Sequence, residues 1–166
     1  MNAPTVVAAD VRPDNERDAL VVDVGRWERL ALAALVDEGA TGELTLTFVS
    51  DDEIAELNAE HMGKDGPTDV LSFPLDDDAD DVPDGVPRLL GDVVVSPAVA
   101  ERQAPEHAGT LDDEIALLVV HGVLHVLGHD HAEPAETDRM RRREVELLGA
   151  HHWGGPAPDG FRQSHD

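Results

Sequence analysis

The sequence predicts an α+β fold in which a small mixed β-sheet packs with about five helices. Three observations support this fold class. First, the chain has 166 residues, and 41% of them are hydrophobic, as expected for one domain with its own core. Residues 43–49 alternate between apolar and polar side chains, as a half-buried strand does. Residues 111–127 and 134–148 have the apolar content, length and end signals of helices. We therefore expect a single domain over residues 1–153, followed by a flexible tail at 154–166.

The N-terminal half of the chain predicts alternating strands and helices. Residues 6–8 form a short apolar run typical of an edge strand. A helix is expected from Asp14 onward, because apolar residues recur at helical spacing up to a glycine-containing turn. After the strand at 43–49, Ser50 and Glu53 match a capping box that begins the next helix.

Further along the chain, two strands flank an acidic loop. The strands are expected at residues 68–73 and 91–96, as a hairpin-like pair. Between them, residues 76–88 are rich in Asp, Pro and Gly, and their Asp spacing does not match a calcium-binding EF-hand loop. This segment is therefore interpreted as a solvated loop. A further helix is expected from Pro97.

The composition excludes several functional classes. The absence of cysteine excludes disulfides, thiolate zinc sites and a cysteine nucleophile. With 12 basic and 36 acidic residues the net charge is −24, so indiscriminate binding to nucleic acid is disfavoured. No apolar run approaches the roughly 18 residues of a membrane span, and no signal-peptide pattern is present at the N-terminus. We expect a cytoplasmic protein without a membrane partner.

The clearest chemical signature is HGVLHVLGHDH, residues 121–131. His121 and His125 are four residues apart on a predicted helix, so their imidazoles project from one face on adjacent turns. Gly128 is placed to end the helix and turn the chain back, which allows His131 to supply a third nitrogen. Three neutral imidazoles suit Zn²⁺ and leave a fourth position for water, as in catalytic zinc sites.

Two other interpretations of this signature are a pair of core histidines without a metal and the metal site of a protease. Histidines on an apolar helix face are often satisfied core residues, but burying two on the most apolar helix is unfavourable unless each finds a partner. The spacing is also that of metzincin metalloproteases, which carry a glutamate directly after the first histidine as general base. Here that position is Gly122, so the metzincin-like helix retains the metal spacing and lacks the base for peptide hydrolysis.

Three motifs in order resemble those of the YbeY family of bacterial endoribonucleases. HGVLHVLGHDH is similar to the family's HGxLHLxGYDH. The family's second motif, LN…GKDxPTDVLSFP, is similar to Leu57-Asn58 followed by residues 63–74, GKDGPTDVLSFP. Gly91-Asp-Val-Val-Val-Ser96 resembles the GDIxIS strand. The resemblance implies a zinc-dependent, single-strand-specific endoribonuclease acting in rRNA maturation, at the 16S rRNA 3′ end, and in ribosome quality control. It also implies single-stranded RNA, rRNA and the ribosome as partners.

The resemblance assigns one zinc ion per chain to His121, His125 and His131. His129 stands where the family usually has tyrosine, and is interpreted as a residue behind the ligands or on the surface. Zinc would lower the pKa of a bound water or polarise a phosphoryl oxygen. The general base is unassigned; Asp130 is a weak candidate that more simply orients a ligand histidine.

For substrate binding the chain departs from the family at Met62, where the family commonly has an arginine that engages RNA phosphate. Lys64 is the nearest alternative cation and a weak catalytic candidate, and the arginines of residues 139–143 are further candidates or simply a solvated helix face. The residues expected to bind phosphate or line the pocket are Lys64, Thr68, Ser72 and Arg88.

Two rival functions remain open at this point. One is a ribosome-associated assembly factor with a structural zinc, in which His129 or Asp130 would complete the coordination sphere. The other is a metallohydrolase of peptide or ester bonds, which Gly122 disfavours. The acidic composition and an aromatic content of only 3% argue against free RNA binding, so the nuclease hypothesis requires a neutral or positive groove beside the histidines.

Overall fold

The structure, a computed structural model, describes residues 5–11, 22–75, 89–129 and 133–163. The strands are β1 (Thr5–Val11), β2 (Gly42–Phe48), β3 (Val70–Pro74) and β4 (Leu89–Val95). The α-helices are α2 (Val24–Asp37), α3 (Asp51–Met62), α4 (Pro97–Gln103), α5 (Leu111–Val126) and α6 (Pro134–Leu148). A 3₁₀ turn, η2 (Ala104–Glu106), follows α4, and a π-helical turn, η3 (Gly149–Trp153), continues α6.

The strands form one mixed sheet in the order β1-β2-β4-β3. β1, β2 and β4 run parallel, whereas β3 is antiparallel to β4. The antiparallel pair is the expected hairpin-like pair, and the acidic loop at 76–88 lies outside the described residues. The predicted α+β class with a small mixed sheet and five helices is therefore confirmed for the described residues.

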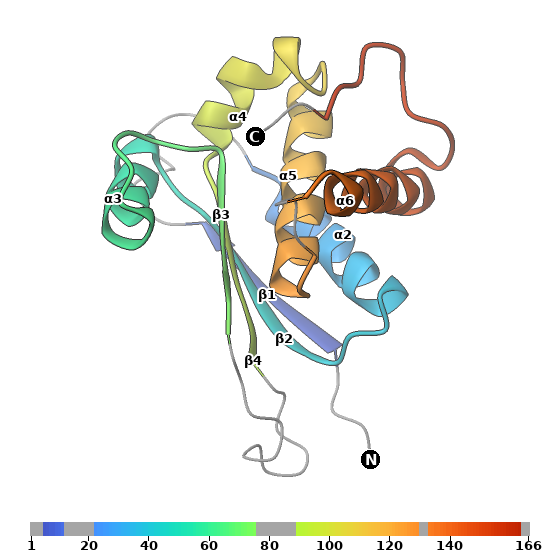
Figure 1. The fold of residues 1–166 in the computed structure, drawn as a ribbon, viewed down its shortest axis with the longest axis horizontal. Helices are drawn as coiled ribbons and strands as arrows, with labels where there is room; N and C mark the ends of the chain where they lie inside the picture. The colour runs from blue at the N-terminus through green and yellow to red at the C-terminus, as the bar shows by residue number, and fades with distance from the viewer. Residues whose placement is uncertain (1–4, 12–21, 76–88, 130–132, 164–166) are drawn as a thin grey trace.

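Both faces of the sheet are covered, as the alternation of side chains along β4 requires (Figure 1). Val93 and Val95 belong to the main core, which also contains buried residues of α2, α5 and α6. Val94 points to the opposite face, where it packs with Ile54 of α3 and Leu71 of β3. Helix α5 thus stands on one face of the sheet, with α6 outside it, and α3 on the other (Figure 1).

Helix α5 is the central helix of the fold. It contacts α2, α4, α6, β3 and β4, and 12 of its 16 residues are buried, as its nearly continuous apolar sequence predicted. It approaches β4 closely at Gly122: a Cβ added there would lie 2.5 Å from Cγ1 of Val93. Only glycine at this position lets the helix lie this close to the strand.

The start of one helix differs from the sequence-based expectation. The helix expected from Asp14 begins at Val24, because the Asp23 side chain accepts a hydrogen bond from the Arg26 N–H and caps it; residues 12–21 lie outside the described residues. The segment after Gly154 makes contacts as far as Gln163, residues 164–166 lie outside the described residues, and the flexibility expected of 154–166 stays a prediction. No helix of the described residues is long and apolar enough to cross a membrane.

The close approach at Gly122 predicts that Gly122→Ala destabilises the fold. The added Cβ would overlap the buried Val93, so we expect a loss of about 1–3 kcal/mol in the free energy of unfolding, measured by urea denaturation. Gly25→Ala is the matched control, since its Cβ would meet only the ends of two side chains, and it should be neutral or stabilising. Val93→Ala should partly rescue Gly122→Ala in a double-mutant cycle; additivity of the two losses would contradict this packing.

Candidate metal centre

The two histidines of α5 lie together, as their spacing predicted. His121 is buried, with 8% of its surface exposed, and His125 is half-buried. Their ring centroids are 4.5 Å apart with an interplanar angle of 76°, so one ring meets the other edge to face. The helix therefore presents two imidazoles from adjacent turns at one place.

His121 is held by a buried carboxylate from another helix. Oε2 of Glu144, on α6, is 2.6 Å from Nδ1 of His121, and Glu144 is only 1% exposed. Because a carboxylate accepts hydrogen bonds, Nδ1 is the ring nitrogen that carries a proton, and Nε2 would be the one to ligate a metal. The other carboxylate oxygen of Glu144 accepts from Nε2 of Gln163 at 2.9 Å.

The sequence analysis did not identify Glu144, although the sequence contains a signal for it. Met140, Glu144, Leu147 and Leu148 are the buried residues of α6 and follow helical spacing. An acidic residue in an otherwise apolar stripe must find a partner in the core, and here that partner is His121.

Helix α5 ends directly after the histidine pair, at the predicted glycine. Gly128 has φ of +100°, a conformation that side chains rarely adopt. Its N–H donates to the carbonyl of His125 at 3.0 Å, and the N–H of His129 donates to that of Leu124 at 2.9 Å. This pair of bonds is a Schellman motif, which turns the chain away from the helix axis at this point.

Three of the predicted site residues lie outside the described residues: Arg88, Asp130 and His131. Within the described ranges, no third His, Cys, Asp or Glu joins His121 and His125 in a group able to hold a metal ion. The three-histidine ligand set therefore stays a prediction. The part that is described fits zinc in its donor type: two imidazoles, one of them backed by a carboxylate.

His129 belongs to a separate network at the C-terminal end of α2. Its Nε2 is 2.9 Å from Oε1 of Glu38, whose other oxygen accepts from Nε of Arg143 at 2.6 Å. Hydrogen bonds from His151 and Arg143 lower the pKa of Asp37. Burial opposes the charge of Arg143, but its bonds to Glu38 and Asp37 outweigh burial and raise its pKa. Because Nε2 contacts Glu38, a ligand role for His129 would use its other ring nitrogen, Nδ1.

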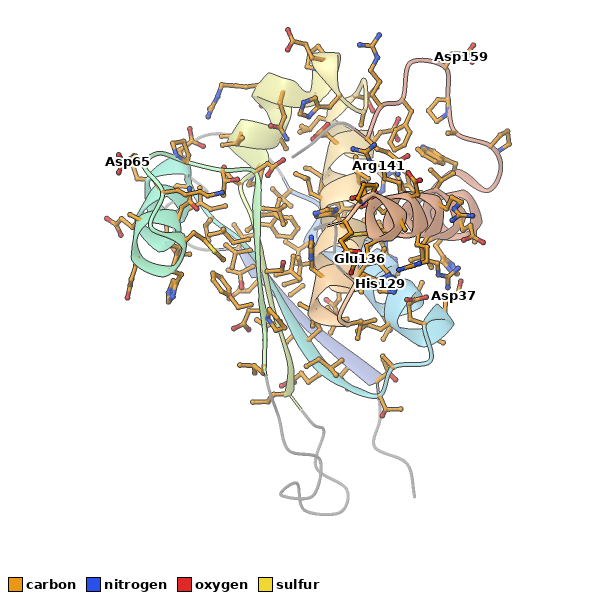
Figure 2. The ribbon with its side chains drawn as sticks, viewed as in Figure 1. Asp37, Asp65, His129, Glu136, Arg141 and Asp159 are labelled. Carbon is orange, nitrogen blue, oxygen red and sulfur yellow. The ribbon has the colours of Figure 1, made fainter. Side chains whose placement is uncertain are left out.

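The loop after α3 carries the candidate cation Lys64. The side chain of the buried Asn58 donates from Nδ2 to the main-chain carbonyl of Gly66 at 3.0 Å. The main-chain carbonyl of Asn58 accepts from the Lys64 N–H at 3.3 Å. Lys64 and Met62 are both exposed. Asp65 marks this loop in Figure 2, on the α3 side of the molecule and away from α6.

The remaining candidates are Thr68, which lies just before β3, and Ser72, in the middle of that strand. Both are half-buried, and Ser72 is paired with Val93 of β4 in the sheet register. The Thr68 hydroxyl donates to Oδ1 of Asp69 at 3.3 Å, so part of its role is local and structural. The structure does not bring Lys64, Thr68 or Ser72 into hydrogen bonds with the two histidines within the described part of the chain.

A second buried carboxylate that the sequence analysis missed connects β3 to α5. The Gln103 amide donates to Oδ2 of Asp69 at 2.7 Å and to Oε2 of Glu114 at 2.8 Å. Glu114 is fully buried and also accepts from the Ala108 N–H at 3.1 Å. This network ties the start of β3 to the first turn of the helix that carries the histidines.

The Glu144–His121 contact predicts a measurable role in metal affinity. Glu144→Gln should weaken Zn²⁺ binding about 10–100-fold, because the amide can accept the His121 bond but lacks the negative charge that raises ligand basicity. Affinity is measured by competition with a chromophoric chelator, without any activity assay. Glu146→Gln, an exposed position on the same helix, is the control. Wild-type affinity in a folded Glu144→Gln variant would contradict this role.

Comparison with known proteins agrees with the motifs and the fold. A sequence model of the family described as "Endoribonuclease YbeY" matches residues 14–152. The chain is 48% identical over 116 residues to Endoribonuclease YbeY of Carboxydothermus hydrogenoformans, covering 70% of this chain and 77% of that protein. It is 42% identical over 148 residues to the Frankia casuarinae protein of the same name, covering 85% and 73%.

A solved structure supports the same fold. The solution structure of TM1509 from Thermotoga maritima aligns with a TM-score of 0.56 and 27% sequence identity, covering 87% of this chain and 91% of that one. The family match extends over most of the chain and includes the helix with the histidine pair and the helix with Glu144. This chain therefore belongs to the endoribonuclease YbeY family.

Proposed function

We propose that this chain is a zinc-dependent endoribonuclease that cleaves single-stranded RNA in rRNA maturation, at the 16S rRNA 3′ end, and in ribosome quality control. The observation that carries the proposal is the buried His121–Glu144 pair beside His125. The endoribonuclease names of relatives at 41–48% identity support the reaction class. We further propose a cytoplasmic location, with rRNA and the ribosome as partners.

In this proposal one zinc ion per chain is held by His121, His125 and His131. When bound, it would supply a Lewis acid that polarises a phosphoryl oxygen and acidifies water. The chain's own contribution is to orient the ligands: Glu144 fixes the proton of His121 on Nδ1, and the turn at Gly128 ends the helix before the third histidine. The attacking group, water or the ribose 2′-hydroxyl, and the general base are unassigned.

Packing on the sheet counts against the peptide-hydrolase alternative. The base of a metzincin would occupy the position of Gly122, where even a Cβ would lie 2.5 Å from Val93. A glutamate therefore does not fit there without displacing the Val93 side chain. The structural-zinc alternative needs a fourth protein ligand. Its candidate His129 contacts Glu38 through Nε2, so Nδ1 would be its ligating atom, and its other candidate, Asp130, lies outside the described residues.

Cleavage of labelled RNA tests the proposed function. Purified protein should cut single-stranded but not double-stranded RNA, lose activity with chelator and regain it with zinc. His125→Ala should lower the rate roughly 100-fold or more, because it removes a predicted ligand. His151→Ala, a histidine of η3, is the matched control and should retain activity.

The same assay separates the alternatives. A folded, zinc-loaded protein that cuts no RNA would contradict the nuclease proposal and favour the assembly-factor role. Zinc-dependent hydrolysis of casein or an ester substrate, lost in His125→Ala, would favour the peptide or ester hydrolase instead. RNA cleavage that persists unchanged in His125→Ala would point to a contaminating nuclease.

A further inference from the structure

Helix α6 concentrates positive charge in a strongly acidic chain. Four of the 12 basic residues fall within five consecutive positions, at 139 and 141–143. Arg143 is half-buried and pairs with Glu38 and Asp37. The other three, Arg139, Arg141 and Arg142, are exposed, and no ion pair joins them to a carboxylate within the described ranges.

These arginines line a surface hollow whose charge is opposite to that of the chain. The hollow has a volume of about 1190 Å³. Its lining residues are His129, Asp138, Arg139, Arg141, Arg142, Arg143, Val145, Glu146 and Gln163. Four arginines thus face two carboxylates, whereas the whole chain has 12 basic against 36 acidic residues. A polyanion would therefore meet a local excess of positive charge here, in contrast to the net negative charge of the chain.

The hollow adjoins the C-terminal end of α5, the helix that carries the histidine pair. A second, smaller hollow of about 270 Å³ shares His129 and Arg139 with the first and adds Leu127, Gly128 and Glu136. Leu127 and Gly128 directly follow the last turn of α5, which contains His125. In Figure 2, His129 lies beside α6 near this end of α5, and Glu136 and Arg141 are both residues of α6. Because Glu144 of α6 also holds His121, the helix that bears the arginines is attached directly to the candidate metal centre.

We propose that Arg139, Arg141 and Arg142 bind the phosphodiester backbone of single-stranded RNA along the exposed face of α6. The inference rests on the proposed function and adds a binding surface outside the metal centre. Guanidinium groups that are not neutralised by carboxylates can bind phosphate oxygens bidentately. With only 3% aromatic residues, the chain has little capacity for base stacking, so phosphate contacts supply the affinity. The contacts are independent of base sequence and sensitive to salt.

The experiment measures RNA affinity and catalysis separately. Dissociation constants for a fluorescent single-stranded RNA are determined by anisotropy at several salt concentrations. The triple variant Arg139→Gln/Arg141→Gln/Arg142→Gln should bind roughly tenfold or more weakly, and the slope of log K against log salt should fall by about 2, since each phosphate contact contributes about 0.7. KM should rise while kcat at saturating RNA stays near wild type.

Matched variants isolate the effect. Arg29→Gln removes an exposed arginine of α2 that does not line the hollow and should leave both affinity and slope unchanged. Lysine at all three positions keeps the charge and should retain most of the salt slope. The three single Arg→Gln variants should each lower the slope by about 0.7, so the test does not depend on the triple variant alone.

The outcomes distinguish this inference from the proposed function. If the wild type cleaves RNA but the folded triple variant keeps the wild-type dissociation constant, KM and salt slope, the α6 surface is not the binding site. If the wild type neither binds nor cleaves single-stranded RNA, the proposed function fails and the inference fails with it. If kcat falls while affinity is unchanged, the arginines act on the metal centre and not on RNA binding.

Discussion

The contact between His121 and Glu144 organises the candidate metal centre of this protein. It joins α5, the central helix, to α6 through a 2.6 Å hydrogen bond between two buried polar groups. Neither group would be stable in an apolar core alone, because an unpaired buried carboxylate or imidazole is strongly unfavourable. The docking of α6 and the orientation of the imidazole therefore depend on each other. Gln163, which donates to the same carboxylate, extends this dependence to the C-terminal segment.

The acidity of the chain has a structural use in addition to its effect on partners. Asp23 caps α2, while Asp69, Glu114 and Glu144 accept buried or half-buried hydrogen bonds that connect distant segments. Carboxylates used in this way are neutralised or hydrogen-bonded inside the fold. The basic residues are distributed differently, since α6 gathers a third of them on one short stretch. Net charge alone is therefore a poor guide to what this protein binds.

The resemblance of the histidine spacing to that of a protease family illustrates how packing limits chemistry. The same i, i+4 spacing serves a different reaction when the residue after the first histidine faces a β-strand instead of an open cleft. Here Val93 occupies the space that a side chain at position 122 would need. Gly122, which stands where a metzincin has its glutamate base, is thus also required for α5 to pack closely against β4.

Local signals in the sequence determined the elements and the histidine pair. The capping box at Ser50, the alternation of β2 and the glycine at 128 each depend on interactions within a few residues. Their effects can therefore be predicted from the sequence without knowledge of the fold. The partner of His121 and the contacts of Gln163 were not readable in this way, because they join segments far apart in the chain. Glu144 lies 23 residues from His121 and becomes its partner only when α6 crosses α5. Tertiary packing alone decided which carboxylates were buried and which arginines stayed exposed, since desolvation depends on neighbours that sequence order does not specify.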